Sequence, residues 1–452
     1  MKVLLTGATG LIGKNLGIDL VREGHQVIVL SRDATRARLD CPFPAEHCEW
    51  GQLEQIPKMS IDAVVHLAGE SIAGGFWTKD RKKKIIDSRV ETTSRLVNVF
   101  KTSGKIPKVW INASAIGFYG DRQDEVLTEE SKKGTGFLSQ VCVKWEEALL
   151  PLQDECRLVI YRFGVVLSKR SGALSAMMPA FRLGLGGHLG SGKQWMSWIH
   201  EDDLRAAIVF GLKSDKLKGV ANLVSPTPVT NSQFTQTLNL ALSKNNFLPI
   251  PRFALELAGE ISQLVLASQK VVPNVLMQAG FKFSYDTLEI ALRNLIDYQM
   301  RSGVFEIYQA QWVPKTVTEI FPFFCDEKNL EELTPELLNF KVIGKNTPMI
   351  QEGTLIDYKL KIRGVPAKWR TRIIDWKPGK SFVDTQLKGP YNLWHHTHEF
   401  KDLGGGTLMT DRVLYKTPLW PLSIAVLPLI RHDVGAIFNY RRRIVAKMFG
   451  SS

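Results

Sequence analysis

Residues 3–13 of the chain read Val-Leu-Leu-Thr-Gly-Ala-Thr-Gly-Leu-Ile-Gly, an apolar run followed by three glycines spaced three apart. The apolar run predicts a short buried strand, and an amphipathic helix is expected from Leu11 to Arg22. A second apolar run, Gln26 to Leu30, completes the strand–helix–strand unit that a dinucleotide-binding glycine motif requires. The first glycine permits a tight turn, the second lets backbone approach a pyrophosphate, and the third lets the helix pack closely on the sheet. The stretch therefore predicts a phosphate site facing the amides at the helix N-terminus.

The residues after the second strand indicate which nucleotide is bound. NAD-binding chains usually carry an acidic residue there, which binds the ribose 2′-hydroxyl. This chain has Ser31 and Arg32 at that point, with Asp33 one place later. A hydroxyl beside a planar guanidinium suits a 2′-phosphate, so NADP(H) is the expected cofactor. A solvated loop arginine is the alternative interpretation.

The composition is that of a folded protein with more than one core. The chain has 452 residues, of which 44% are hydrophobic and 23% charged, and this length predicts two domains. The net charge of +13 is spread along the chain. Because no basic stripe is interleaved with aromatic residues, we expect no nucleic-acid binding. The five cysteines form no Cys-x-x-Cys pair, and their odd number favours reduced thiols and a cytoplasmic location.

No membrane-spanning segment is expected. The N-terminal apolar run breaks at Thr6-Gly7 and is not a signal peptide. The longest apolar stretch, Leu419 to Ile430, contains two prolines and is shorter than the roughly 20 residues that a membrane helix needs. Together with the basic helix after it, this stretch is compatible with weak peripheral contact with an anionic membrane. An apolar lid packed over a cavity is the simpler interpretation.

Strand and helix patterns alternate through residues 1–302. Apolar runs at Ala63–Ala68, Lys108–Ala113 and Arg157–Val166 are separated by helical periods at Lys79–Thr102 and Leu138–Leu149. This alternation predicts an α/β domain with a doubly wound Rossmann-type parallel sheet. Ligands of such sheets bind at the carboxyl ends of the strands.

The pattern changes after the boundary that we place between residues 302 and 303. Residues 303–452 contain a helical stretch and several strand-length segments in succession, and end in a basic helix expected from Val434 to Phe449. This order predicts an α+β domain whose last helix lies across a curved antiparallel sheet. The strand-length segments are Glu306–Val313, Thr354–Lys361, Lys368–Trp376, Ser381–Leu387, Asn392–Phe400 and Thr407–Tyr415, and the helical stretch is Val317–Phe324.

Several motifs of the first domain together resemble one branch of the extended short-chain dehydrogenase/reductase superfamily, the epimerase-like family 39U. They are the glycine motif, Gly69-Glu-Ser-Ile72, Ser88-Arg-Val-Glu-Thr-Thr93, Ser114-Ala-Ile-Gly-Phe-Tyr-Gly120, Lys144-Trp-Glu146 and the segment Phe181–Trp195. The resemblance covers about residues 1–298 and implies an NADP(H)-binding, oxidoreductase- or epimerase-like protein. It implies cofactor contacts from Gly7, Thr9, Gly10, Leu11, Ile12, Gly13, Ser31, Arg32, Leu67, Ala68, Gly69, Arg89 and Val166. For Arg89, an exposed helix arginine paired with Glu91 or Asp87 is an equal alternative.

The catalytic residues depart from the superfamily pattern. The superfamily's proton donor is a tyrosine four residues before a lysine, and none of the nine tyrosines here has a lysine at that spacing. Leu138 and Cys142 stand where the pair is expected. Ser114, Tyr119 and Lys144 are the remaining catalytic candidates: two hydroxyls after a strand and one cation.

Two further segments of the first domain have competing interpretations. His200 precedes three acidic residues, Glu201 to Asp203, and we expect this group to cap and start a helix and not to bind a metal. The glycine-rich loop Gly184–Lys193 has no strand before it, so it is interpreted as a mobile substrate lid.

The second domain resembles the helix-grip superfamily of START and polyketide-cyclase-like proteins. The motifs are loose: Gly389-Pro-Tyr391, Trp394–Phe400, Gly404-Gly-Gly-Thr407, Asp411 and Tyr415. The resemblance implies a cavity for an apolar ligand between sheet and helix. Strand alternation places His396 and His398 on one face. Without a third ligand at a convincing spacing, we expect no metal and interpret these residues as wall or surface histidines.

Three functions fit the sequence. The first is an atypical NADP(H)-dependent oxidoreductase or epimerase-like enzyme, whose second domain holds or delivers an apolar or carbonyl-bearing substrate. The second is a non-catalytic NADP(H) redox sensor, which the missing tyrosine–lysine pair favours. The third is a lipid-binding protein with a vestigial nucleotide domain.

Overall fold

The computed structural model describes residues 1–245, 248–257, 259–296, 303–418, 423 and 426–451. The chain divides into two compact units: one comprises Met1–Leu20, His25–Ala34 and His47–Asp297, and the other Val21–Gly24, Thr35–Glu46 and Tyr298–Ser452. The predicted boundary at 302/303 lies at the edge of the segment 297–302, outside the described residues.

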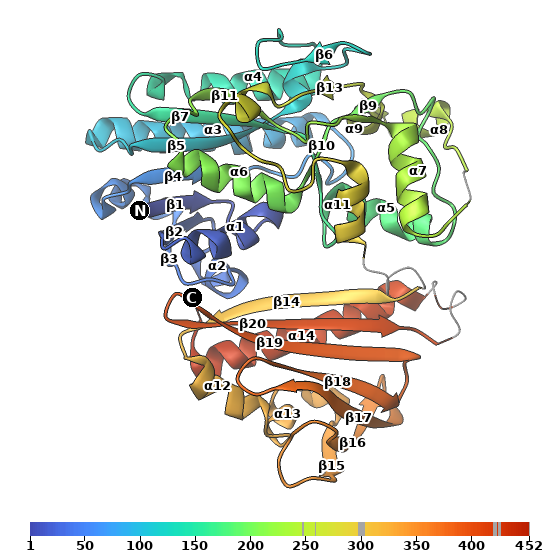
Figure 1. The fold of residues 1–452 in the computed structure, drawn as a ribbon. Coiled ribbons are helices and arrows are strands. Elements are labelled where there is room, and N and C mark those ends of the chain that lie inside the picture. Colours follow the sequence, from blue (N-terminus) through green and yellow to red (C-terminus); the bar gives the residue numbers. More distant parts are fainter. Residues whose placement is uncertain (246–247, 258, 297–302, 419–422, 424–425, 452) are drawn as a thin grey trace. The chain divides into compact units, whose positions relative to one another are not determined.

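The first unit contains a seven-stranded sheet in the order β11-β7-β5-β4-β1-β2-β3 (Figure 1). The pairings of β1 with β2 and β4, of β5 with β4 and β7, and of β7 with β11 are all parallel. The strands are β1 (Lys2–Thr6), β2 (Gln26–Ser31), β3 (Glu46–Glu49), β4 (Ala63–His66), β5 (Val109–Ala115), β7 (Arg157–Phe163) and β11 (Gly219–Leu223). The strand order reverses direction between β1 and β4, where open α/β sheets bind their ligands.

Helices cover both faces of this sheet, as the doubly wound prediction requires. On one face, Leu96 and Phe100 of α3 pack with Leu4, Val64 and Trp110 of the strands. On the other face α6 lies so close that a Cβ on its Gly211 would be 3.2 Å from a methyl of Ile111. The main helices of this unit are α1 (Leu11–Arg22), α3 (Lys79–Ser103), α4 (Phe137–Glu147), α5 (Gly172–Arg182), α6 (Glu201–Lys213), α7 (Asn231–Ala241) and α11 (Leu288–Leu295). From Thr35 onward, α2 (Ala34–Asp40) belongs to the second unit.

One strand expected from the sequence is two strands in the structure. The apolar run Arg157–Val166 breaks at Gly164, after which β8 (Val165–Leu167) leaves the main sheet and pairs with β10 (Trp198–His200). A Cβ on Gly164 would lie 2.7 Å from the carbonyl oxygen of Ser197, so the glycine lets these two segments meet. The prediction of a single strand was therefore wrong, because a run of apolar residues does not show a change of partner.

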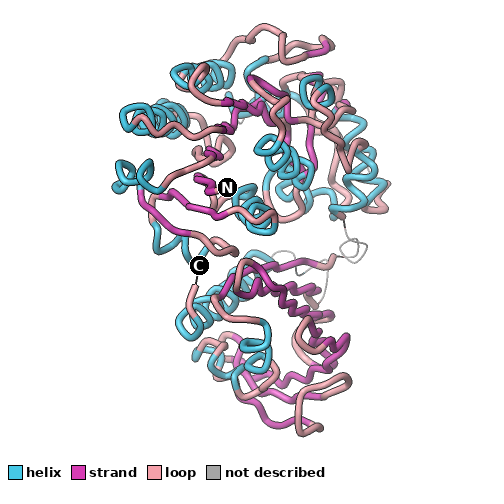
Figure 2. Tube along the Cα trace, turned by 60° about the vertical axis from the view of Figure 1, so that its left-hand side comes forward, coloured by secondary structure: helices cyan, strands magenta, loops and turns pink. Residues whose placement is uncertain are grey.

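The second unit contains a seven-stranded antiparallel sheet in the order β14-β20-β19-β18-β17-β16-β15. Figure 2 shows its strands following one another in a curved sheet. The strands are β14 (Phe305–Val313), β15 (Lys341–Lys345), β16 (Leu355–Ile362), β17 (Val365–Lys377), β18 (Ser381–Lys388), β19 (Leu393–Leu403) and β20 (Gly406–Lys416). The helices are α12 (Val317–Phe324), α13 (Asn329–Glu332) and α14 (Leu427–Phe449). This confirms the predicted α+β unit, although β15 was not expected.

The terminal helix α14 begins seven residues before the expected start at Val434. Pro428 does not prevent this, because a proline in the first turn of a helix interrupts no hydrogen bond. Of the apolar stretch Leu419–Ile430, residues 419–422 and 424–425 lie outside the described residues, and Leu427–Ile430 form the first turn of α14. None of the described helices has both the length and the apolar character needed to cross a bilayer.

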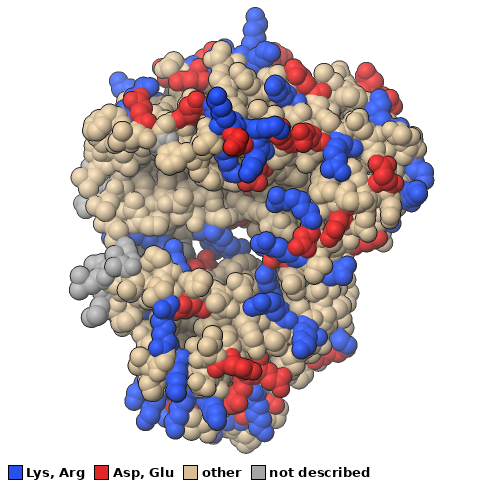
Figure 3. Space-filling view, turned by 180° about the vertical axis from the view of Figure 1, so that it is seen from behind, with Lys and Arg blue, Asp and Glu red and all other residues tan. Residues whose placement is uncertain are grey.

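Charged side chains are interspersed on the face shown in Figure 3, where basic and acidic groups alternate over both units. Basic side chains also gather along the lower left side of the lower unit in this view.

Candidate functional site

The loop between β1 and α1 forms a close-packed backbone turn. Gly7 has φ +71°, and a Cβ on it would lie 2.9 Å from the carbonyl carbon of Leu67. A Cβ on Gly13 would lie 2.6 Å from the Cα of Ala8, so α1 meets the loop at a distance that only glycine allows. The Gly10 amide donates to the carbonyl oxygen of Gly7 at 3.0 Å. The first amides of α1 have no acceptor within the helix, which is the arrangement that binds a pyrophosphate.

The end of β2 carries the two residues expected to select the nucleotide. Within the described residues, the Ser31 hydroxyl oxygen is buried and has no hydrogen-bond partner. Arg32 is exposed beside it. The pKa of Glu70, after β4, is lowered by the hydrogen bond from Arg81, and also by the charges of Arg32 and Arg89. The Ser31 hydroxyl and the Arg32 guanidinium beside it suit a phosphate, because both groups can donate hydrogen bonds to phosphate oxygens.

A buried polar chain joins β1, β4 and two helices beneath these residues. His66 Nδ1 lies 2.7 Å from the Thr6 hydroxyl and His66 Nε2 lies 3.0 Å from the Thr93 hydroxyl, to which Trp145 Nε1 also donates. The amides of Leu67 and the next residue donate to the Thr6 oxygen. Burial lowers the pKa of His66 to about 4, so this histidine is neutral at pH 7. These hydrogen bonds fix the loop that contains Leu67 and Ala68, two of the predicted cofactor-binding residues.

Arg89 lies on α3 with its guanidinium beside Gly69. A Cβ on Gly69 would be 3.1 Å from the guanidinium carbon, and the guanidinium lies over the Trp145 ring at 5.1 Å. Burial lowers the pKa of Arg89. Asp87, the alternative partner, is paired with Lys83. The structure therefore places Arg89 at the sheet edge with the other predicted cofactor residues.

The remaining predicted contacts lie around the start of α1. Leu11, Ile12 and Val166 are partly buried, and Thr9 is exposed. A Cβ on Gly172, at the start of α5, would be 3.4 Å from Leu11 Cδ2 and 3.7 Å from the carbonyl oxygen of Val166. The segment after β7 thus comes close to the glycine loop, although more than 150 residues separate Leu11 from Val166 in the sequence.

The catalytic candidate Ser114 belongs to a second hydrogen-bonded chain. Its hydroxyl donates to Glu146 Oε1 at 2.6 Å, and Arg162 holds both oxygens of that carboxylate at 2.9 and 2.7 Å. Arg162 also donates to the Tyr119 hydroxyl at 3.0 Å, which donates to Asn222 Oδ1 at 2.7 Å. Ser114 is only 2% exposed and Tyr119 is fully buried. Burial raises the pKa of Tyr119, and its hydroxyl is bonded to Arg162 and Asn222.

Helix α4 carries the positions where the superfamily has its tyrosine and lysine. Leu138 and Cys142 face η2 (Ile116–Tyr119), where a Cβ on Gly117 would be 3.2 Å from Leu138 Cβ and 3.7 Å from Cys142 Sγ. Burial raises the pKa of Cys142 to about 12, so its thiol stays protonated. Lys144 is exposed on another face of the helix. The structure therefore does not bring Lys144 together with Ser114. The residue of α4 that contacts Ser114 is Glu146, one turn after Cys142.

Comparison with known proteins identifies the family. The NAD dependent epimerase/dehydratase family matches residues 3–223, and a domain of unknown function (DUF1731) matches residues 250–295. An Arabidopsis thaliana protein, the epimerase family protein SDR39U1 homolog, chloroplastic, is 40% identical over 306 residues, which are 66% of this chain and 87% of that protein. The chain belongs to the NAD dependent epimerase/dehydratase family.

Two solved structures resemble this epimerase-family chain. Human epimerase family protein SDR39U1 (isoform 2), crystallised with NADPH, has a TM-score of 0.61 and 34% identity over 65% of this chain and 99% of that chain. A nucleoside-diphosphate sugar epimerase from Corynebacterium glutamicum has a TM-score of 0.53 and 31% identity over 74% of this chain and 64% of that chain. These matches support the predicted resemblance to the 39U branch. The helix-grip family of the second unit stays a prediction.

The acidic group after β10 caps a helix in this epimerase-family chain, as expected. His200 is the N-cap of α6, and its Nδ1 accepts from the amide of Asp202 at 3.0 Å. Its ring stacks on Tyr285 with centroids 3.7 Å apart. Burial lowers the pKa of His200 to about 4.

The glycine-rich loop Gly184–Lys193 is hydrogen-bonded through its backbone to the segment after α7. The amide of Ile250 donates to the carbonyl oxygen of His188 at 2.9 Å.

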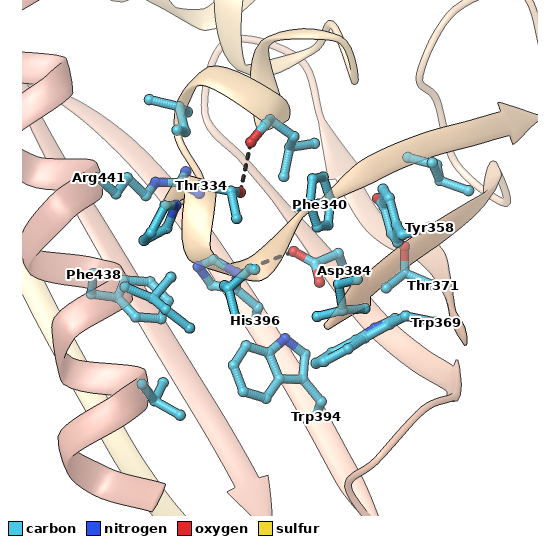
Figure 4. Close-up of a pocket in the computed structure, with 18 of the residues that line it drawn as sticks. Thr334, Phe340, Tyr358, Trp369, Thr371, Asp384, Trp394, His396, Phe438 and Arg441 are labelled. Carbon is cyan, nitrogen blue, oxygen red and sulfur yellow. Dashed lines mark hydrogen bonds and ion pairs between the residues drawn. The ribbon is translucent and has the colours of Figure 1, made fainter. Parts of the chain in front are cut away.

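A cavity of about 600 Å³ lies inside the second unit, between the sheet and α14. Helix-grip resemblance predicts a cavity at this place, and the structure has one. Figure 4 shows aromatic side chains around it. Lining side chains include Phe324 of α12, Leu330 of α13, Tyr358 of β16, Trp369 of β17, Trp394 of β19 and Phe438 of α14. This lining suits an apolar molecule.

One wall of this cavity carries buried charged groups. His396 Nδ1 lies 3.2 Å and His398 Nε2 lies 3.0 Å from Asp384 Oδ2. The opposite ring nitrogens, His396 Nε2 and His398 Nδ1, lie 2.9 and 3.0 Å from Asp411 Oδ1. Burial alone would lower the pKa of His396, but the two carboxylates outweigh it and raise that pKa. Burial alone would raise the pKa of Asp384, but the two histidines lower it.

Sequence reasoning missed three functional candidates in these two sites. Glu146 of α4 appears in the sequence only as part of a motif, and Arg162 lies opposite Ser114 across the β5–β7 pairing. Asp384 is opposite His396 across the β18–β19 pairing. The sequence alone does not show how strands and helices pair, so it does not reveal either of these two contacts. An acidic residue on a neighbouring strand with alternating apolar and polar residues could nevertheless have suggested the contact between Asp384 and His396.

Proposed function

We propose that the first unit binds NADP(H) at the carboxyl ends of β1, β2 and β4. The observation that carries this proposal is the buried Ser31 hydroxyl, which lacks a partner beside Arg32 within the described residues. The human relative of 34% identity, crystallised with NADPH, supports the same nucleotide. A Cβ on Gly7 or Gly13 would collide with backbone, so these glycines let the loop and α1 pack in the close arrangement typical of a pyrophosphate site.

We propose an oxidoreductase or epimerase-like activity at the end of β5. When bound, NADP(H) supplies or accepts a hydride. Ser114 can accept a hydrogen bond from a substrate hydroxyl and relay that proton along its own 2.6 Å hydrogen bond to Glu146. Arg162 holds both carboxylate oxygens of Glu146 in an ion pair. This arrangement replaces the tyrosine–lysine pair with a serine–glutamate–arginine chain.

Calorimetric titration with both nucleotides tests the nucleotide assignment. In Arg32→Ala, NADPH binding should weaken by about 1.5–3 kcal/mol, the contribution of a hydrogen bond to a charged group, while NADH binding stays nearly unchanged. Arg36→Ala is the matched control, because this arginine is exposed on α2 and pairs with Asp40. Equal losses for both nucleotides would contradict the assignment.

A non-catalytic sensor of NADP(H) is the second candidate, favoured by Leu138 and the un-ionised Cys142 at the tyrosine–lysine positions. Single-turnover absorbance at the nicotinamide band distinguishes the two. Oxidation of bound NADPH by any member of a carbonyl panel, abolished in Glu146→Gln, supports the enzyme. If no compound of the panel oxidises the bound NADPH, the result supports the non-catalytic sensor.

The cavity of the second unit, we propose, holds an apolar small molecule that is the substrate or the sensed ligand. Its aromatic and aliphatic lining supports this proposal. Native mass spectrometry of the purified chain tests it. A co-purifying lipid without nucleotide would instead favour a lipid-binding protein whose nucleotide site is vestigial.

A further inference from the structure

The charged wall of the cavity has the composition of a metal site. Asp384, His396 and His398 each offer one ligand atom, and these atoms lie within 4.8 Å of one another. Two imidazoles and one carboxylate are the donor set of many catalytic zinc sites and of iron(II) oxygenases, and such sites leave further positions open. Figure 4 shows Asp384 and His396 directed toward one another at the cavity.

The spacing of the three atoms suits a bound ion. Oδ2 of Asp384 is 3.2 Å from His396 Nδ1 and 3.0 Å from His398 Nε2. Around a tetrahedral ion with bonds of about 2.0–2.1 Å, neighbouring ligand atoms lie about 3.3 Å apart. The two distances from Asp384 are within a few tenths of an ångström of this value, and all three ligand atoms lie within 4.8 Å of one another. All three residues are held by paired strands, β18 and β19.

The outer groups are arranged as in metal sites. Asp411 Oδ1 faces the other nitrogen of each histidine, 2.9 Å from His396 Nε2 and 3.0 Å from His398 Nδ1. An outer carboxylate of this kind fixes the tautomer of a metal-ligating histidine and directs its lone pair toward the metal. Arg441 of α14 lies 3.5 Å from Asp411 and holds that carboxylate in turn.

Acidic groups surround the two imidazoles. Asp384 and Asp411 face different nitrogens of each ring, and Arg441 lies beside Asp411. The aromatic rings of Phe382 and Phe438 lie 4.3 Å from His398 and 5.3 Å from His396. A cation bound between Asp384 and the imidazoles would therefore meet a carboxylate in largely apolar surroundings.

We propose that Asp384, His396 and His398 bind one divalent transition-metal ion, whose open position faces the cavity and takes the oxygen-bearing head group of an apolar ligand. The ligand's chain would then lie against the aromatic lining. Metal binding at this site does not require nucleotide binding in the first unit, so the two proposals fail independently.

Cobalt(II) titration of the chelator-treated full chain tests the site. One equivalent should bind and give the visible absorption of a nitrogen-ligated cobalt ion. Affinity should fall at least 100-fold in His396→Gln and His398→Gln. In Asp411→Asn, which removes an outer carboxylate only, it should fall 10- to 100-fold.

His395→Gln is the matched control, because His395 lies on the same strand but is only partly buried, and alternation directs it to the other face. Its affinity for cobalt should equal that of the unchanged chain. An alkyl hydroxamate should shift the cobalt spectrum, and the alkyl amide of the same length should not, if the open position faces the cavity.

Absence of the cobalt spectrum in the unchanged chain, with its fold verified by circular dichroism, would overturn the proposal whatever the variants do. Equal cobalt binding by His396→Gln and the unchanged chain would overturn it as well. In either case the cluster is a proton-sharing ion pair.

Discussion

Two serine hydroxyls in the first unit differ in what surrounds them. The Ser114 hydroxyl has a partner, since it donates to Glu146 at 2.6 Å. The Ser31 hydroxyl oxygen is buried but has no partner within the described part of the chain. A buried hydroxyl without a partner costs free energy in the unliganded protein, and the cost is recovered when a ligand supplies the partner.

We therefore predict that Ser31→Ala leaves the unfolding free energy of the unliganded chain within about 0.5 kcal/mol of the original, or raises it. NADPH affinity should fall by about 1–2 kcal/mol, because the lost donor faces a phosphate. Urea unfolding and calorimetry measure the two quantities. A large loss of stability with unchanged affinity would mean that Ser31 has a structural partner and no phosphate.

Single residues also mark the limit of the sequence. Ser31 and Arg32 could be predicted, because their place after β2 follows from the glycine motif alone. Tyr119 was predicted as catalytic because it follows Ser114 in the same loop, but the structure buries it against Arg162 and Asn222. The sequence does not show that Asn222, 103 residues away, lies beside it.

At the scale of elements, the contact between β1 and α1 depends on Gly13. A methyl group there would lie 2.6 Å from the Cα of Ala8 and would also overlap the Gly7 carbonyl oxygen. Gly13→Ala should lower the unfolding free energy by about 1–3 kcal/mol, the range for overpacking, and weaken NADPH binding. Gly51→Ala is the control, since a Cβ there meets nothing within 4 Å.

Urea unfolding of the two glycine variants checks this prediction. If Gly13→Ala is as stable as Gly51→Ala, the helix does not depend on close approach to the loop, and the pyrophosphate geometry inferred from it fails.

The buried hydrogen bonds of His66, which join β1, β4 and α3, make the stability of the protein depend on pH. The pKa of His66 is about 4 in the folded chain and about 6.5 in the unfolded chain, so the unfolded chain binds the proton more tightly. Stability from this group is complete above pH 6.5 and is lost as the pH falls toward 4, by about 3 kcal/mol in total.

His66→Gln should lower stability at pH 7 and remove this group's part of the acid loss. The remaining acid loss should include that of His200, whose pKa is also lowered to about 4. Unfolding free energies at pH 7, 6, 5 and 4 measure both effects. Identical pH slopes for the variant and the original chain would contradict the buried neutral histidine.

Elements were predicted well where one sheet or one helix face decides the pattern. The helix Leu11–Arg22 and the helix Val317–Phe324 have the expected bounds. The break at Gly164 and the short strand β15 were not predicted, because they depend on partners that local periodicity does not contain.

At the scale of the molecule, each unit has its own apolar core. We predict that NADPH at 100 times its Kd stabilises the first unit by about 2.7 kcal/mol and leaves the unfolding of the second unit unchanged. Calorimetric scans with and without NADPH should show one transition that moves and one that does not. A single transition that moves as a whole would show that the units unfold together.

The central claim is that Arg32 and Ser31 bind the 2′-phosphate of NADP(H). Phosphorus NMR of NADP⁺ bound to the full chain measures this contact directly, because the free 2′-phosphate titrates with a pKa of about 6. A bound phosphate that donors and a guanidinium surround should keep its dianion to lower pH, so its pKa should fall. A 2′-phosphate that titrates in the complex as it does in free NADP⁺ would contradict the claim.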